Sequence, residues 1–142
     1  MAIPNPIVAL VTFFKADSAL SALVGTRVFG AELPNTETES MPRAVVVISP
    51  AGSPPGPGAN SNLSFMSLRL DMKCYGTTPL TAWSVYLAVR DALKGLEGSV
   101  KDTVLLYDAS IEGGPIQLRD ADLEWPLVLG TFNLRVSETA VA

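Results

Sequence analysis

Residues Leu63 to Leu96 have the sequence LSFMSLRLDMKCYGTTPLTAWSVYLAVRDALKGL, which contains the clearest strand pattern of the chain. From Leu63 to Tyr75, apolar and polar residues alternate, a period of two that is typical of a β-strand with one buried face. After Gly76, apolar residues recur every three or four positions, which is the spacing of one helix face. The segment therefore predicts a long strand that leads directly into a helix.

The same pattern assigns the faces of both elements. The strand separates its apolar from its polar residues: Met66, Leu68, Leu70, Met72 and Cys74 on one side, Ser67, Arg69, Asp71 and Lys73 on the other. The helix is expected to begin at Thr78-Pro79 and to end at Gly95 and Gly98. Its buried side comprises Ala82, Val85, Tyr86, Val89, Leu93 and Leu96, and is widened by Trp83 and Leu87.

Two short helices are expected near the N-terminus. Asn5-Pro6 and Asp17-Ser18 each place a capping residue at a helix start, and Gly25 suits a helix end. We therefore expect two helical pieces in tandem between Pro6 and Val24.

Five further runs predict strands. They are Arg27–Phe29, Ala44–Ile48, Thr103–Tyr107, Ile116–Arg119 and Leu127–Val136, with Gly113-Gly114-Pro115 as a turn. The second run is apolar throughout, as expected for a strand that is covered on both faces. The order helices, strands, helix, strands predicts one α+β domain over residues 1–142, with a mainly antiparallel sheet and helices packed on one face.

Residues 50–62 have a different composition from the rest of the chain. They include Pro54, Pro55, Pro57 and three glycines, with no charge and no large apolar residue. Such a segment cannot bury enough surface to fold alone, and it exceeds the usual hairpin connection of about two to five residues. We expect a long, flexible Pro/Gly-rich hairpin loop, whose three prolines are candidate contacts with a neighbouring subunit.

The overall composition favours association with partners. The chain has 142 residues, of which 48% are hydrophobic and 17% charged, against about 25% charged in ordinary soluble domains. Its mean hydropathy is +0.32. Some apolar surface is therefore expected to be covered by partners, with an unusually apolar monomer as the alternative. No apolar run approaches the ~20 residues that cross a bilayer, and neither a signal peptide nor membrane association is expected.

The sequence offers little for catalysis. It contains no histidine, which removes the common catalytic triads and the commonest zinc ligand. Cys74, the single cysteine, falls on the apolar side of its strand, where a buried and inert thiol is expected. The net charge of −4 argues against tight binding of nucleic acid. We expect no enzyme activity, no catalytic residue and no cofactor.

Carboxylates are the remaining candidates for a site. Asp120, Asp122 and Glu124 alternate by two, so on an extended segment all three point to one side. They could hold a divalent cation, as in a metal-dependent hydrolase, but a solvated acidic rim is the favoured interpretation and no metal site is predicted. Glu37 and Glu39 lie in a polar loop and are assigned to solubility.

Two more residues are candidates for contact with another subunit. Trp125 stands beside Pro126 among acidic residues, and tryptophan is enriched at the energetic centres of interfaces. Asp71 lies between Arg69 and Lys73, where surface ion pairs worth about 0–1 kcal/mol each are expected. Trp125 and Asp71, with the three prolines, form the predicted interface set.

Five stretches occur in an order that carries a resemblance. They are LSALVGTRVF (20–29), PRAVVVI (42–48), LRLDMKCYG (68–76), AWSVYLAVRDAL (82–93) and GTFNLRV (130–136). Together they resemble the tail-completion, or tail-terminator, family of long-tailed (siphovirus-like) bacteriophages. The resemblance implies a helix–sheet–helix–sheet fold without catalytic residues. The Pro/Gly-rich residues 50–62 depart from the family pattern.

The resemblance also implies a function. Members form a homo-hexameric ring that ends the tail tube and joins it to the head-completion (neck) proteins, with DNA only as passing cargo. The expected location is the head–tail junction of the virion, after assembly in the host cytoplasm. An acidic channel wall would let DNA slide without binding. The candidates for that wall are Glu37, Glu39, Asp120, Asp122 and Glu124.

Two alternatives stay open at this point. A neck or head-closure subunit of the same connector is the nearer one, and a small ligand- or peptide-binding module is the more distant one.

Overall fold

The computed structural model describes residues 6–30, 33, 43–50, 65–96, 99–101, 104–119 and 125–138. The predicted α+β class is confirmed. In chain order the elements are α1 (Pro6–Lys15), α2 (Ser18–Val24), β1 (Val28–Gly30), β2 (Val45–Pro50), β3 (Phe65–Tyr75), α4 (Pro79–Lys94), β4 (Ser99–Lys101), β5 (Val104–Arg119) and β6 (Pro126–Glu138).

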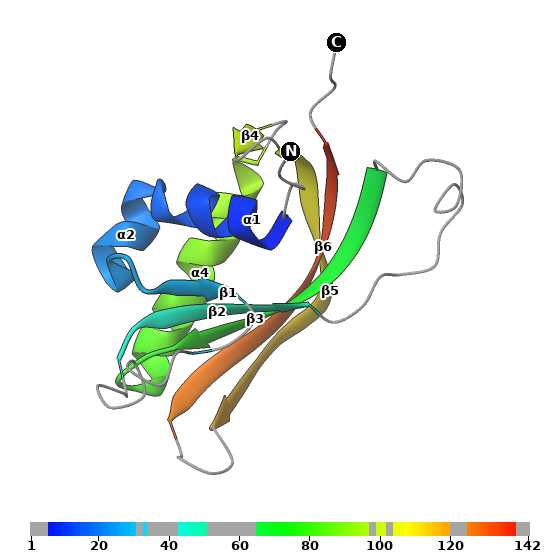
Figure 1. Cartoon of the computed structure of the whole chain (residues 1–142). Coiled ribbons are helices and arrows are strands. Elements are labelled where there is room, and N and C mark those ends of the chain that lie inside the picture. Colours follow the sequence, from blue (N-terminus) through cyan, green and yellow to red (C-terminus); the bar gives the residue numbers. More distant parts are fainter. Residues whose placement is uncertain are drawn as a thin grey trace.

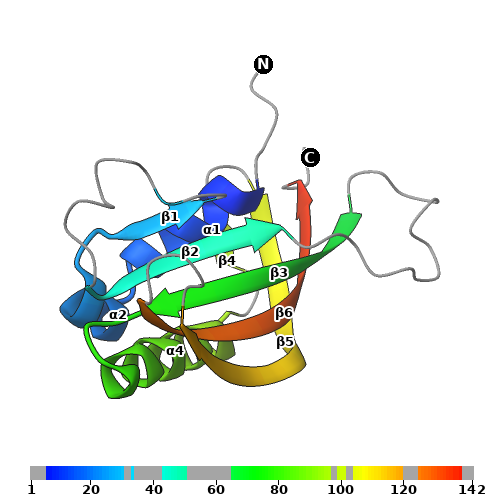
Figure 2. The ribbon, with the colours of Figure 1, turned by 90° about the horizontal axis from the view of Figure 1, so that it is seen from below.

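The described strands form one sheet in the order β1-β2-β3-β6-β5-β4. The pair β1–β2 is parallel and the other neighbouring pairs are antiparallel. β5 and β6 are long and strongly curved, and the helices lie to one side of the strands (Figure 1, Figure 2). β1 therefore stands at one edge of the sheet, and β5 with the short β4 at the other.

Side chains and glycines set the helix ends where the sequence predicts them. The Asp17 carboxylate caps α2 by accepting from the backbone N–H of Leu20 at 2.9 Å. Gly25 follows α2 with a φ of 61°, a conformation that glycine adopts without steric cost. Thr78 caps α4 by accepting from the N–H of Thr81 at 3.2 Å.

The main core joins α1, α2 and α4 to alternate residues of the sheet. Tyr86 of α4 occupies its centre, with its ring stacked on Phe132 of β6 at a centroid distance of 6.1 Å. Gly130 makes room for that ring, because a Cβ there would lie 2.5 Å from Cε1 of Tyr86. The largest other fully buried side chains are Phe14, Leu10, Leu20, Ile48, Leu70, Met72, Leu106 and Leu134.

Strand β3 has the face pattern that its sequence predicts. Leu70, Met72 and Cys74 are at most 1% exposed and belong to the main core. The alternate residues Arg69 and Lys73 lie on the other face and are partly exposed. β3 occupies the centre of the sheet because it pairs with β2 on one side and with β6 over its whole length on the other.

The predicted turn at Gly113-Gly114-Pro115 is wrong. The two strands expected on either side of it are one strand, β5, which pairs with β6 from Val104↔Glu138 to Arg119↔Pro126. Register shifts between Ile111 and Gly113 and between Gly113 and Ile116 take up the extra residues. β-Bulges of this kind let a strand continue through a Gly/Pro sequence while it bends, so pairing with β6 outweighs the local turn preference.

The assignment of Leu87 to the buried side of its helix is also wrong. Leu87 is 53% exposed, whereas Trp83 is partly buried against the main core. Successive helical residues are rotated by about 100°, and Val85, Tyr86 and Val89 take the positions that face the sheet. Leu87 consequently points outward.

In the part of the chain that the structure describes, no single helix is long and apolar enough to cross a membrane. α1 and α2 reach that length and composition only together, and they are bent by 88° relative to each other.

Candidate assembly surfaces

A second apolar cluster lies on the sheet face opposite the main core, and we call it the outer cluster. Its buried members come from three strands, and partly buried neighbours extend it. The members are Val45, Val47, Tyr75 and Leu127, with Phe29, Leu33, Trp125 and Leu129 packed against them. Val45 and Val47 of β2 are buried on this face while Val46 and Ile48 are buried in the main core, which confirms that this strand is covered on both faces.

Trp125, a predicted interface residue, belongs to the outer cluster. Its ring meets Tyr75 edge to face, with centroids 6.1 Å apart and an interplanar angle of 79°. This contact fixes one edge of the indole within its own chain, and the residue as a whole remains partly exposed. Trp125 is therefore held in place at the border between the outer cluster and the surface.

The outer cluster continues into exposed apolar side chains on β5. Ile116 is 54% exposed and Leu118 is 41% exposed. In the register of the sheet they stand beside Leu129 and Leu127 of β6, which places all four on the same face. We call Ile116 and Leu118 the β5 patch. The alternation Ile-Gln-Leu in the sequence indicates a strand at these residues. The turn predicted just before them is the reason why the long strand β5 was not predicted.

Asp71 forms a hydrogen bond in place of the predicted ion pairs. Its carboxylate accepts from the hydroxyl of Thr131 at 3.0 Å, because the register sets these two residues directly opposite each other. Arg69 instead meets Glu112 of β5, with Nη2 and Oε2 4.0 Å apart. Among the described residues Asp71 has no ion pair with Arg69 or Lys73, so that expectation is wrong.

The thiol of Cys74 is buried, as its sequence position predicts. Its side chain is fully enclosed in the main core, and burial raises its pKa far above the usual value because a thiolate loses its hydration there. Burial likewise raises the pKa of the Tyr86 hydroxyl, and the positive charge of the nearby Arg90 partly offsets this increase. A protonated thiol without access to solvent is a poor nucleophile.

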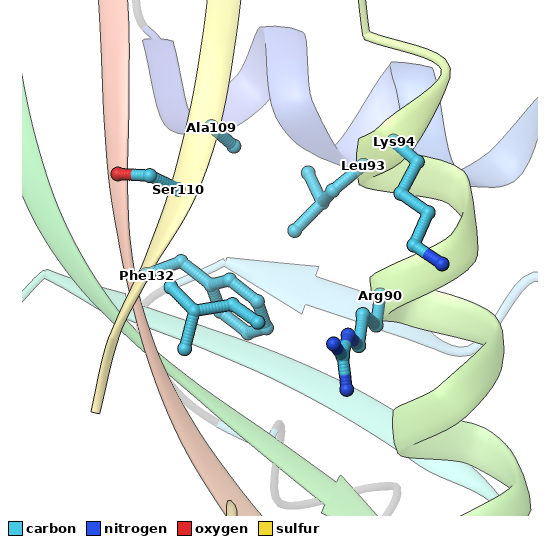
Figure 3. Close-up of a pocket in the computed structure, with 7 residues that line it drawn as sticks. Arg90, Leu93, Lys94, Ala109, Ser110 and Phe132 are labelled. Carbon is cyan, nitrogen blue, oxygen red and sulfur yellow. The ribbon is translucent and has the colours of Figure 1, made fainter. Parts of the chain in front are cut away.

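A groove runs between α4 and β5 at the edge of the sheet. It encloses about 260 Å³ and is lined by Arg90, Leu93, Lys94, Ala109, Ser110, Ile111 and Phe132. Figure 3 shows the two cationic side chains on α4 opposite β5, with the Phe132 ring between the elements. Farther along α4, Nε1 of Trp83 donates to Oε1 of Gln117 at 2.8 Å and ties the helix to β5.

The other predicted site residues lie outside the described residues. These are Pro54, Pro55, Pro57, Glu37, Glu39, Asp120, Asp122 and Glu124. Within the described ranges, no group of three Cys, Asp or Glu side chains could hold a metal ion.

Comparisons with known proteins agree with this architecture. Residues 8–141 match the family model described as Tail completion protein gp17. A chain in a solved structure entitled "Virion of native gene transfer agent (GTA) particle" has the same fold, with a TM-score of 0.64 and 21% sequence identity over 92% of both chains. No curated protein matches the chain.

The structural match shows that the chain shares this α+β fold, and apolar side chains are exposed on its sheet. Because the family model covers nearly the whole chain, the chain belongs to the tail completion protein family and is a structural protein of the phage tail.

Proposed function

We propose that the chain forms a homo-oligomeric, six-fold ring that ends the phage tail tube and joins it to the head-completion proteins of the neck. The ring would sit at the head–tail junction of the virion and would assemble in the host cytoplasm. Its partners would be further copies of the chain, the tail tube protein and a neck protein. Membership of the tail completion family supports this general role.

The β5 patch is the main structural support for the proposed ring. Ile116 and Leu118 extend the outer cluster across the sheet to an exposed edge, so a neighbour that covered them would enlarge an apolar surface that is already packed. Single exposed apolar residues are common, but a patch continuous with a buried cluster is typical of interaction surfaces. Trp125 borders the same cluster and is proposed as an anchor of that contact.

The low charge of the chain supports the same proposal. Only 17% of residues are charged, against about 25% in ordinary soluble domains. A share this low is easier to explain if part of the surface is covered by other subunits. We keep Asp71 and the prolines Pro54, Pro55 and Pro57 as proposed interface residues.

DNA would pass through the ring without binding to it. The net charge of −4 disfavours phosphate binding. We propose Asp120, Asp122 and Glu124, at the connection between β5 and β6, as acidic residues of the channel wall.

Native mass spectrometry of the purified chain, together with localisation of the chain in the particle, tests the proposal. We expect a ring of six copies at the top of the tail tube. Absence of a ring both in solution and in the particle would contradict the proposal, and a position within the neck would favour a head-closure subunit instead. Purified ring that retains duplex DNA at physiological salt would contradict the acidic wall.

A further inference from the structure

The groove between α4 and β5 combines two cations with an apolar floor. Leu93 is 6% exposed and Phe132 is 2% exposed at its base, while Ile111 at its border is 46% exposed. Arg90 and Lys94 are exposed on α4 above this floor. A surface of this kind suits a ligand segment that presents carboxylates toward the helix and packs its backbone against apolar groups.

Arg90 is the uncommitted charge of the groove. Among the described residues it has no carboxylate within 4 Å, whereas Lys94 meets Asp91 at 3.6 Å on the exposed side of the helix. Glu112, the residue after Ile111, is held by Arg69 and does not line the groove. The local excess of charge in the groove is therefore positive, although the whole chain is acidic.

The groove also lies along a part of β5 that, among the described strands, pairs on one side only. β4 covers β5 only at Val104–Leu106, and beyond that point β5 pairs with β6 alone among the described strands. Register shifts after Leu106 and after Ile111 bound a short edge between them. An unpaired edge of this length offers backbone hydrogen bonds to an added extended segment of about four or five residues.

The spacing of the two cations selects the kind of segment. Arg90 and Lys94 are one helical turn apart, about 6 Å along the axis. In an extended chain, residues two positions apart point to the same side and are separated by about 6.6 Å. Two carboxylates at alternate positions of an extended segment would therefore match the two cations.

Residues 36–40, Thr-Glu-Thr-Glu-Ser, have this pattern, with Glu37 and Glu39 at alternate positions and β-branched threonines between them. In the sequence they connect β1 to β2, and β1 forms the sheet edge opposite to the groove. A segment that begins at one edge of the sheet and a groove at the opposite edge suit a head-to-tail contact between subunits. Contacts of this kind can close into a ring. The acidic residues 120–124 are less suited, because they bridge the paired residues Arg119 and Pro126.

We propose that the α4–β5 groove receives residues 36–40 of a neighbouring copy of the chain, with Glu37 and Glu39 facing Arg90 and Lys94. This inference rests on the proposed ring and assigns one of its contacts. It places Glu37 and Glu39 between subunits and leaves the channel wall to the other acidic residues.

Charge exchange tests the contact. Assembly of the full-length chain is followed by native mass spectrometry over a concentration series, and folding is followed by thermal unfolding. Arg90→Glu should raise the concentration for half assembly about tenfold or more, because attraction becomes repulsion, while Arg90→Gln should have a smaller effect. Lys15→Glu, the same change of charge on an exposed residue of α1, is the matched control and should leave assembly within about twofold of the wild type.

Combination variants identify the segment that binds. Glu37→Arg or Glu39→Arg should weaken assembly alone and restore it in combination with Arg90→Glu. Restoration by Asp122→Arg instead, or assembly unchanged in Arg90→Glu, would overturn the proposed contact while leaving the ring intact. A wild-type chain that forms no ring in solution or in particles would contradict the proposed function itself, and this inference with it.

Discussion

Gly76 lies directly against the first turn of α4. A methyl group on its Cα would come within 2.4 Å of the backbone nitrogen of Ala82 and within 2.8 Å of the carbonyl carbon of Thr81. The N–H of Gly76 also donates to the carbonyl oxygen of Pro126 at 3.2 Å, which ties this turn to β6. The close approach lets β3 pass into α4 within three residues and fixes where the helix crosses the sheet.

Replacing Gly76 by alanine should therefore destabilise the fold. The added methyl group would meet backbone atoms, which cannot rotate away, so we expect a loss of about 1–3 kcal/mol or more in the free energy of unfolding. Gly114→Ala is the matched control, since a Cβ at Gly114 would meet no atom within 4 Å. Urea unfolding measures both, and equal stability of the two variants would contradict the close approach.

The sequence predicts the elements around this turn well because their signals are local. The alternation of β3, the capping residues Asp17 and Thr78, and the glycines after α2 and α4 each act within a few residues. Patterns of this kind depend on neighbouring residues in the sequence and not on distant contacts. The helix–strand order and the α+β class follow from them.

The predictions from sequence fail where contacts between residues distant in the chain determine the structure. Gly113-Gly114-Pro115 has the composition of a turn, but pairing with β6 carries β5 through it. Asp71 stands between two cations in the sequence, yet its partner Thr131 is 60 residues away. The β5 patch and the groove beside Arg90 depend on which strands are neighbours, which the periodicity of one strand does not specify.

Leu70 and Asp71, consecutive residues of β3, should differ sharply in their contribution to stability. Leu70 is fully buried, so Leu70→Ala should cost about 2–5 kcal/mol. Asp71→Ala removes one partly exposed hydrogen bond to Thr131 and should cost about 1 kcal/mol. Chemical denaturation of both variants checks the ranking, and the reverse order would mean that the faces of β3 are exchanged.

The buried thiol of Cys74 predicts a loss of stability at alkaline pH. Because its pKa is raised in the folded state, the unfolded chain releases this proton first, from about pH 8.5 upward. Below that pH the thiol's contribution to the free energy of unfolding is fully present. Above it, that free energy should fall by at most about 1.4 kcal/mol per pH unit. Urea unfolding between pH 7 and pH 10 measures the slope. Cys74→Ala should be less stable throughout but show a shallower slope, and identical slopes would rule out the thiol as the cause.

The β5 patch should matter for assembly and not for folding. Ile116→Thr and Leu118→Thr remove apolar surface from side chains that are 54% and 41% exposed, while threonine keeps the strand preference. The melting temperature of the monomer should therefore change little. If a neighbour covers the patch, each change should weaken every contact of the ring by about 1 kcal/mol, since full burial of such side chains contributes about 1.5–3 kcal/mol. Leu80→Thr, at a residue that is 79% exposed on α4, is the matched control. Native mass spectrometry over a concentration series should then show weaker assembly for the two β5 variants only. Equal weakening in all three variants would mean that general surface hydrophobicity, and not this patch, holds the copies together.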